Sequence, residues 1–202
     1  MFCTGQLVDE AIHFAVKAHS GMNRKGTNIP YILHPMEAGA IAAGITDNAE
    51  VIAAAILHDV MEDAGITKNE LQKHFGAHVA DLVAAESENK RTDIPAAEGW
   101  EMRKRESLQF LENSASRDEK IITLADKLSN IRAIHRDYMH LKEDLWLRFN
   151  QKDKSKHAWY YGTIGDLLRN ELETTTQWRE YNALVEKVFG NAGVYNSGNY
   201  SE

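Results

Sequence analysis

The sequence predicts an all-α fold, a single bundle of roughly eight to ten helices. Apolar residues recur at the helical period through most of the chain, and convincing two-residue alternation is absent. No Asn-Gly or Asp-Gly pair is present to turn a β-hairpin. Only 3 prolines interrupt the 202 residues, and no break in composition divides them. We therefore expect one domain over residues 1–189 and a disordered tail at 190–202, which is rich in Gly, Asn and Ser.

Each expected helix carries apolar residues at the helical spacing. In the first helix, Leu7, Ala11 and Ala18 fall on one stripe. The second is nearly all apolar up to His58, as in a helix that is buried on most sides. The expected helices lie at residues 7–19, 51–60, 70–85, 100–111, 119–135, 156–172 and 176–189.

Capping residues mark where several helices begin. Thr67 opens the tetrapeptide TKNE, which is a capping box, and Asp118 is expected to cap a later helix. Pro35 suits the first position of a further helix, which would place His34 at its N-cap. Two segments that are polar or contain Pro and Gly are expected to be irregular, at 19–35 and 86–98.

Composition indicates a soluble protein with no general affinity for polyanions. Hydrophobic residues make up 43% of the chain, which is enough to bury a core, and the net charge is −7. A net-negative chain has no general attraction to nucleic acid or to an anionic membrane. The start of the chain shows no secretory signal, and no apolar run approaches about 20 residues. The single cysteine, Cys3, excludes an intrachain disulfide, so we expect a cytoplasmic protein.

The hexapeptide HDVMED at 58–63 places four ionisable side chains at the end of an apolar helix. Residues three and four positions apart share a helix face, so these groups are expected to line one side. Carboxylates beside a buried helix are unfavourable unless a cation neutralises them. The alternative is a helix that reaches solvent at His58 and ends with ordinary charges.

Polar groups also interrupt apolar stretches elsewhere in the chain. His34, taken alone, is more often a structural histidine than a ligand. Asp126 and Asn130 are four residues apart and share one face of an expected helix. An aspartate in the middle of such a helix usually has a buried partner, which is either a cation or a salt bridge with a residue such as Lys127 or Arg132.

Considered together, these groups form a ligand set for one divalent metal ion. Two imidazoles and two carboxylates offer neutral nitrogen and anionic oxygen, from His34, His58, Asp59 and Asp126. Because no cysteine takes part, the set is typical of a catalytic rather than a structural metal site. Glu62 and Asp63 lie one turn further on and are not needed as ligands, so they are candidates for moving protons in catalysis.

Three segments resemble the hydrolase domain of RelA/SpoT homologues, within the HD superfamily of metal-dependent phosphohydrolases. They are AHSGMNRKGTNIPYILHP at 18–35, AAAILHDVMED at 53–63 and LADKLSNIRA at 124–133. The resemblance covers roughly residues 5–172, and the chain looks like a stand-alone small alarmone hydrolase. Met22 departs from the family, which commonly has Gln there. The resemblance implies an HD-domain bundle that removes the 3′-pyrophosphate of (p)ppGpp, a stringent-response alarmone, with one Mn²⁺ ion.

The resemblance also implies which residues meet the nucleotide. Arg24 stands where the family stacks a cation on the base, and Lys25 where a cation meets phosphate. The other matching positions are Thr27, Asn28, Tyr31, Asn130 and either Tyr160 or Tyr161. Without these motifs, the basic pair would be a solvated charge cluster and the two tyrosines an aromatic core face.

Three functions remain open at this stage. The first is hydrolysis of (p)ppGpp to GDP or GTP and pyrophosphate. The second keeps the chemistry but acts on the phosphate of NADPH or of an adenosine alarmone, because base choice depends on the shape of the pocket. The third is an alarmone sensor without catalysis, against which Glu62 and Asp63 argue because binding alone does not need them. The ligand set would also accept Fe²⁺, Co²⁺ or Zn²⁺ in place of Mn²⁺.

Overall fold

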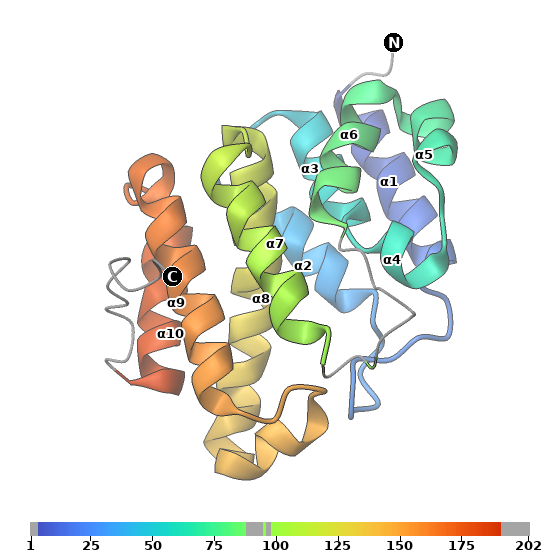
Figure 1. Cartoon of the computed structure of the whole chain (residues 1–202). Coiled ribbons are helices and arrows are strands. Elements are labelled where there is room, and N and C mark those ends of the chain that lie inside the picture. Colours follow the sequence, from blue (N-terminus) through green and yellow to red (C-terminus); the bar gives the residue numbers. More distant parts are fainter. Residues whose placement is uncertain (1–3, 88–94, 96–97, 191–202) are drawn as a thin grey trace.

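Helices provide the regular secondary structure of the computed structural model, which describes residues 4–87, 95 and 98–190 (Figure 1). In that part of the chain no strand forms, and the all-α prediction is confirmed. The helices are α1 (Thr4–Ala18), α2 (Leu33–Ala43), α3 (Ala49–Leu57), α4 (Val60–Ala64), α5 (Lys68–Phe75), α6 (Ala77–Glu86), α7 (Trp100–Asn113), α8 (Arg117–Leu141), the 3-10 helix η1 (Lys142–Arg148), α9 (Lys154–Leu172) and α10 (Thr176–Phe189). The disordered tail expected at 190–202 lies outside the described residues apart from Gly190.

Helix α8 occupies the centre of the bundle. It packs against α2, α3 and α6 toward one side and against α9 and α10 toward the other (Figure 1). Its first turn carries a capping box, in which Ser116 accepts from the Glu119 N–H and the Glu119 carboxylate accepts from the Ser116 N–H. Its largest fully buried side chains are Ile121, Ile122, Leu124, Leu128 and Ile131. The helix that carries Asp126 and Asn130 is therefore held on most sides.

The structure confirms one of the expected caps and corrects two others. Thr67 forms the predicted capping box. Asp118 does not cap α8, because the hydroxyl of Ser116 lies three residues before Glu119 and takes that position. His34 lies inside the first turn of α2 rather than at its N-cap, since the backbone is already helical at Ile32. A proline in this turn is tolerated because its missing N–H would have no intrahelical partner.

Two expected helices are each divided into two. The helix expected at 70–85 becomes α5 and α6, which are separated by Gly76 at a φ of 89°, in the left-handed region that favours glycine. The helix expected at 51–60 ends at Leu57, and the short helix α4 starts at Val60. Most of the segment expected to be irregular at 86–98 lies outside the described residues.

Helices α2 and α3 approach each other closely at Gly39. A Cβ atom at this position would lie 2.4 Å from Cγ1 of Ile56, so only a residue without a side chain fits there unless α3 shifts. Both helices also pack against α8. Three elements that carry predicted ligands therefore meet in one region of the bundle.

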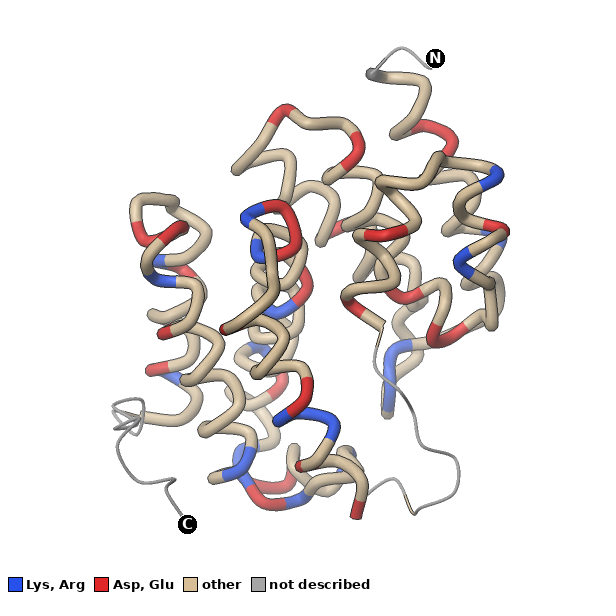
Figure 2. The backbone as a smooth tube through the Cα atoms, turned by 45° about the horizontal axis from the view of Figure 1, so that its top comes forward, with Lys and Arg blue, Asp and Glu red and all other residues tan. Residues whose placement is uncertain are grey.

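Among the described residues, charges of both signs are interspersed along the backbone (Figure 2). This distribution agrees with the net charge of −7. None of the helices in the described part of the chain has the length and apolar character needed to cross a membrane.

Because α8 is central, truncation of its core side chains is expected to destabilise the whole domain. Leu124→Ala, at a fully buried position, should lower the free energy of unfolding by about 2–5 kcal/mol. Leu147→Ala, at a position that is 65% exposed, should change it by less than about 0.5 kcal/mol. Urea denaturation followed by circular dichroism measures both, and equal losses would contradict a central role for α8.

Candidate functional site

Four ligand atoms converge where α2, α8 and the junction between α3 and α4 meet. Nε2 of His34 lies 3.2 Å from both Nε2 of His58 and Oδ1 of Asp126. Oδ2 of Asp59 lies 2.9 Å from Nε2 of His58 and 3.5 Å from Nε2 of His34. Both imidazoles and Asp126 are buried, while the Asp59 side chain is 20% exposed. The structure thus brings together all four residues of the predicted ligand set.

The His58-Asp59 pair sits at a helix junction, not within one straight helix as the sequence pattern suggested. Nδ1 of His58 lies 2.8 Å from the carbonyl oxygen of Ala55, inside α3. A ring N–H that donates there competes with the backbone N–H that would continue the helix, and such insertions bend helices. The same bond leaves Nε2 of His58 as the nitrogen that faces the cluster.

The carboxylate of Asp126 has partners outside the cluster as well. Lys127 pairs with its Oδ2, and the side-chain amide of Asn130 donates to its Oδ1. The salt bridge considered from the sequence therefore exists with Lys127, whereas Arg132 pairs with Glu37 and Glu180 instead. Asp126 keeps Oδ1 directed at the two imidazoles while Oδ2 is held by the lysine.

The pKa shifts of the cluster residues indicate that nearby positive charge stabilises the two carboxylates. Burial would lower the pKa of His58, but Asp59 and Asp126 outweigh burial and raise that pKa well above its usual value. Burial would raise the pKa of Asp59, yet His58 and His34 hold it well below the usual range. Burial acts on Asp126 in the same way, and Lys127 and the two histidines hold its pKa low. Either protons on the imidazoles or a metal ion can supply this charge.

The donor set and its spacing fit a divalent metal ion. His34, His58 and Asp126 each offer an atom within 4.8 Å of the others. Ligand atoms about 2.1 Å from one shared ion lie about 3.0–3.4 Å apart, which is close to the spacings found here. Imidazole nitrogen with carboxylate oxygen suits several first-row metals, so the set by itself does not select one of them.

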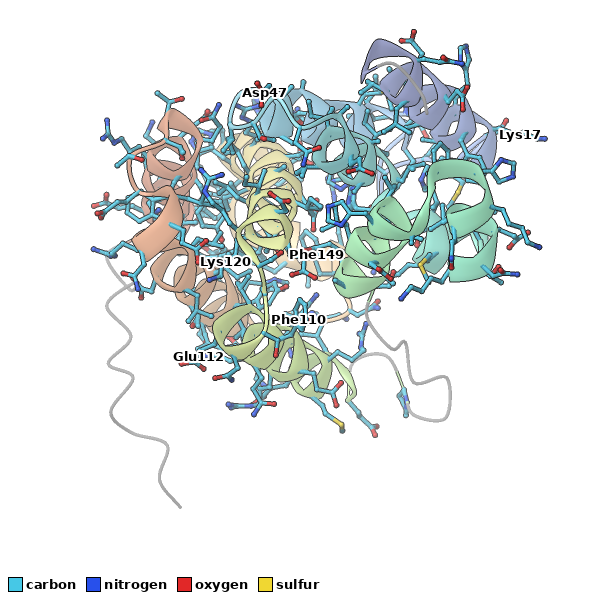
Figure 3. The ribbon with its side chains drawn as sticks, turned by 90° about the horizontal axis from the view of Figure 1, so that it is seen from above. Lys17, Asp47, Phe110, Glu112, Lys120 and Phe149 are labelled. Atoms are coloured by element: carbon cyan, nitrogen blue, oxygen red, sulfur yellow. The ribbon has the colours of Figure 1, made fainter. Side chains whose placement is uncertain are left out.

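A cavity of about 190 Å³ contains most of the predicted nucleotide-binding residues. The guanidinium of Arg24 donates to Oδ1 of Asn130 at 2.7 Å and lies over the Tyr31 ring, 5.6 Å from its centroid. Phe149, which also lines the cavity, is labelled near the centre of Figure 3. Lys17 and Glu112 are labelled near the edges of the molecule in the same view. The predicted residues that line the cavity are Arg24, Lys25, Thr27, Tyr31, Asn130 and Tyr161.

Tyr31 joins this cavity to the ligand cluster. Its hydroxyl donates to Oδ2 of Asp59 at 2.5 Å, and its ring forms part of the cavity wall. Burial and the Asp59 carboxylate raise the pKa of Tyr31, so the hydroxyl remains a donor. A ligand in the cavity would therefore lie beside the cluster.

Two predicted nucleotide-binding residues lie elsewhere. Asn28 is exposed and is not part of the cavity lining. Tyr160 lines a second cavity of about 350 Å³, where the Lys104 ammonium lies 4.7 Å from its ring centroid. Of the two tyrosines that the sequence could not distinguish, Tyr161 is thus the one beside Arg24.

The second cavity has a polar wall that the sequence did not indicate. Glu86 accepts a hydrogen bond from the Thr123 hydroxyl at 2.6 Å, and Lys127 also lines the space. Desolvation raises the pKa of Glu86 to about 7, although Lys127 and Thr123 oppose the shift. Because Lys127 pairs with Asp126, this cavity borders the ligand cluster through that ion pair.

Glu62 and Asp63 lie on α4, directly after the ligand junction. Glu62 is half-buried and Asp63 is exposed. The charge of Asp63 acts on the pKa of both His19 and Tyr31, which places it near the site. Their position agrees with the prediction that they flank the ligand set without belonging to it.

Several residues at the site were not predicted. Arg148 lines the smaller cavity and pairs with Asp137, and Ser129 lies 2.8 Å from Nδ1 of His34. Ser129 lies three residues after Asp126 and so shares its helix face, which is a signal that could have indicated Ser129. Arg148 is the last residue of the 3-10 helix η1 and lies in a stretch where the family resemblance is weak, so it was not predicted as a site residue.

Comparison with known proteins agrees with this geometry. Residues 11–150 match the HD domain family. A guanosine-3′,5′-bis(diphosphate) 3′-pyrophosphohydrolase MESH1 from Xenopus tropicalis is 37% identical over 134 residues, which are 64% of this chain and 70% of that protein. The Homo sapiens protein of the same name is 40% identical over 63% of this chain and 69% of its own length. A GTP pyrophosphokinase rsh from Brucella ovis is 29% identical over 83% of this chain but only 22% of that protein.

Solved structures share the fold. The crystal structure of lmo0812 from Listeria monocytogenes EGD-e superimposes with a TM-score of 0.67 at 29% identity, over 77% of this chain and 98% of that one. A structure described as a metazoan ortholog of SpoT that hydrolyzes ppGpp gives a TM-score of 0.69 at 24% identity, over 90% of this chain and 94% of that one. By its sequence match, its relatives and its helical architecture, the chain belongs to the HD domain family.

Proposed function

We propose that this protein hydrolyses the 3′-pyrophosphate of guanosine alarmones, converting (p)ppGpp and water to GDP or GTP and pyrophosphate. The observation that carries the proposal is the convergence of His34, His58 and Asp126, with Asp59 in contact with both imidazoles, beside a cavity lined by Arg24 and Asn130. The relatives named as pyrophosphohydrolases support the substrate class. We further propose Mn²⁺ as the metal and the cytoplasm as the place of action.

The chemistry requires charge neutralisation and a nucleophile formed in place, because a pyrophosphate ester repels hydroxide. His34, His58, Asp59 and Asp126 would hold a divalent ion, which would supply a lower pKa for water and positive charge beside the phosphoryl oxygens. Water then attacks phosphorus, the bond from phosphorus to the ribose 3′-oxygen breaks, and that oxygen takes a proton. The protein must therefore accept one proton and deliver one.

The cavity residues orient the nucleotide for this reaction. Asn130 and the Tyr31 ring hold the Arg24 guanidinium in place, so it is ready to stack on a base without much loss of side-chain freedom. Lys25 donates to Oδ1 of Asn150 at 2.8 Å and can exchange that partner for a phosphate oxygen. We assign proton transfer to Glu62 and Asp63, which follow Asp59 on α4.

The activity itself is tested by incubation of the purified protein with ppGpp and Mn²⁺. We expect equal amounts of GDP and pyrophosphate by ion-exchange chromatography, loss of turnover after chelation, and recovery when Mn²⁺ is added back. Asp126→Ala should stay inactive at all Mn²⁺ concentrations because it lacks a ligand, whereas Asp81→Ala, at an exposed position on α6, should be fully active. Binding of ppGpp without cleavage would indicate a sensor, and preferential cleavage of NADPH would indicate the other substrate class.

Arg24 is expected to act in binding rather than in the chemical step. Arg24→Ala should raise KM for ppGpp by about 10- to 100-fold, the value of a lost charge-assisted contact, while kcat changes less. Lys17→Ala removes an exposed cation of α1 and should leave both constants unchanged. Steady-state kinetics with measured Mn²⁺ saturation separates the two effects, and an unchanged KM in Arg24→Ala would refute the assignment of the cavity.

Glu62 and Asp63 are expected to act on protons without holding the metal. Glu62→Gln and Asp63→Asn should each retain metal and bind ppGpp while kcat falls by about 10²–10⁴. Glu112→Gln, at an exposed position on α7, is the matched control and should keep full activity. Atomic absorption gives the metal content. If the variants lost metal and added Mn²⁺ restored the rate, Glu62 and Asp63 would act by orienting the metal ligands instead of moving protons. Full activity in the double variant would exclude both the proton-transfer role and the orienting role.

A further inference from the structure

A chain of hydrogen bonds leads from the ligand His34 to the surface of α10. Nδ1 of His34 lies 2.8 Å from the Ser129 hydroxyl, which donates to Oε2 of Glu37 at 2.7 Å. Arg132 donates to Oε1 of the same carboxylate at 2.9 Å and forms two further bonds, each of 2.7 Å, with Glu180. His34 and Ser129 are buried, whereas Glu37, Arg132 and Glu180 are each between 35% and 42% exposed.

The group that faces Nδ1 of His34 is a hydroxyl, whereas the group that faces Nδ1 of His58 is a backbone carbonyl. Nδ1 of His58 faces a backbone carbonyl, which can only accept, so that ring must carry its proton on Nδ1 and present the lone pair of Nε2 to the cluster. A hydroxyl can both donate and accept. Ser129 by itself therefore leaves open which nitrogen of a neutral His34 carries the proton.

Glu37 removes this ambiguity. An ionised carboxylate can only accept, so the Ser129 proton points to Glu37 and the Ser129 lone pairs are left for the N–H at Nδ1 of His34. Arg132 donates to the other oxygen of the same carboxylate, so both oxygens of Glu37 act as acceptors. We propose that Glu37 is a positioning residue that acts through Ser129 to fix the tautomer in which Nε2 of His34 binds the metal ion. This inference rests on the proposed metal site and concerns no residue of the cavity.

The geometry makes the direction of the hydrogen bonds testable. In Glu37→Gln, Arg132 can only donate, so it will bind the amide oxygen and turn the amide nitrogen toward Ser129. Ser129 then accepts from the amide, and its own proton, no longer directed at Glu37, is free to turn to Nδ1 of His34, which favours the tautomer with the ring proton on Nε2 and opposes metal binding. In Glu37→Ala, Ser129 is released and is able to adopt either direction. The near-isosteric amide is therefore expected to be more harmful than the truncation.

The experiment measures Mn²⁺ affinity from the electron paramagnetic resonance of the free ion, in the full chain at fixed pH. Glu37→Gln should raise the Kd for Mn²⁺ by about 10- to 100-fold, and Glu37→Ala should raise it by less. Glu180→Gln, the same chemical change on the other side of Arg132, should leave the Kd within about twofold of the unmodified protein. Circular dichroism melts show whether each variant is folded. The proposal is overturned if Glu37→Gln raises the Kd for Mn²⁺ no more than Glu37→Ala does.

A second set of variants keeps the test valid if one protein proves unstable. Ser129→Ala removes the hydroxyl, so Glu37→Gln should then cause no additional loss of Mn²⁺ affinity. An undiminished loss in that background shows that Glu37 acts by another route and overturns the proposal. Because the readout is metal binding, it does not depend on the substrate. Failure to cleave ppGpp would remove the proposed function only, whereas identical Kd values in the Glu37 variants would remove this inference only.

Discussion

The site depends on one constraint: four electron-pair donors directed at one point repel each other unless a cation lies between them. Each donor residue also has a partner outside the cluster, and in the case of Asp59 this partner binds Oδ2, the same oxygen that faces the imidazoles. The partners are the carbonyl of Ala55 for His58, the hydroxyl of Ser129 for His34, the hydroxyl of Tyr31 for Asp59 and the ammonium of Lys127 for Asp126. These partners come from α8, from α3 and from the loop before α2, which makes the packing of those elements part of the metal site.

The fold was predictable from the sequence because long helices repeat their pattern many times. The apolar periodicity identified the main helices of the bundle, and the capping box at Thr67 located a helix start. The details that failed depend on single competing interactions. Gly76 at positive φ divides one expected helix, and Ser116 rather than Asp118 caps α8 because its hydroxyl stands in the right place. Local propensity alone does not decide between such neighbours.

At the site, the sequence predicted the donor atoms but not the geometry behind them. That Asp126 has a buried partner was expected because a charge in an apolar helix needs one, but the choice of Lys127 over Arg132 came only from the structure. Which of two consecutive tyrosines faces Arg24 depends on the rotation of α9, which packing sets. The contact of Ser129 with Glu37 joins residues 92 positions apart, and no local pattern predicts it.

The junction at His58 and Asp59 limits how this arrangement can be transferred to another protein. Successive residues on a straight α-helix point about 100° apart, so two neighbours cannot both face one ion without a change in backbone direction. Here α3 ends at Leu57, Asp59 has a φ of −95° and a ψ of −5°, and α4 starts one residue later. A designer who grafts the His58-Asp59 pair onto an ideal straight helix would reproduce the residues, but one of the two side chains would point away from the ion. The portable unit is the bend together with the carbonyl of Ala55 that stabilises it.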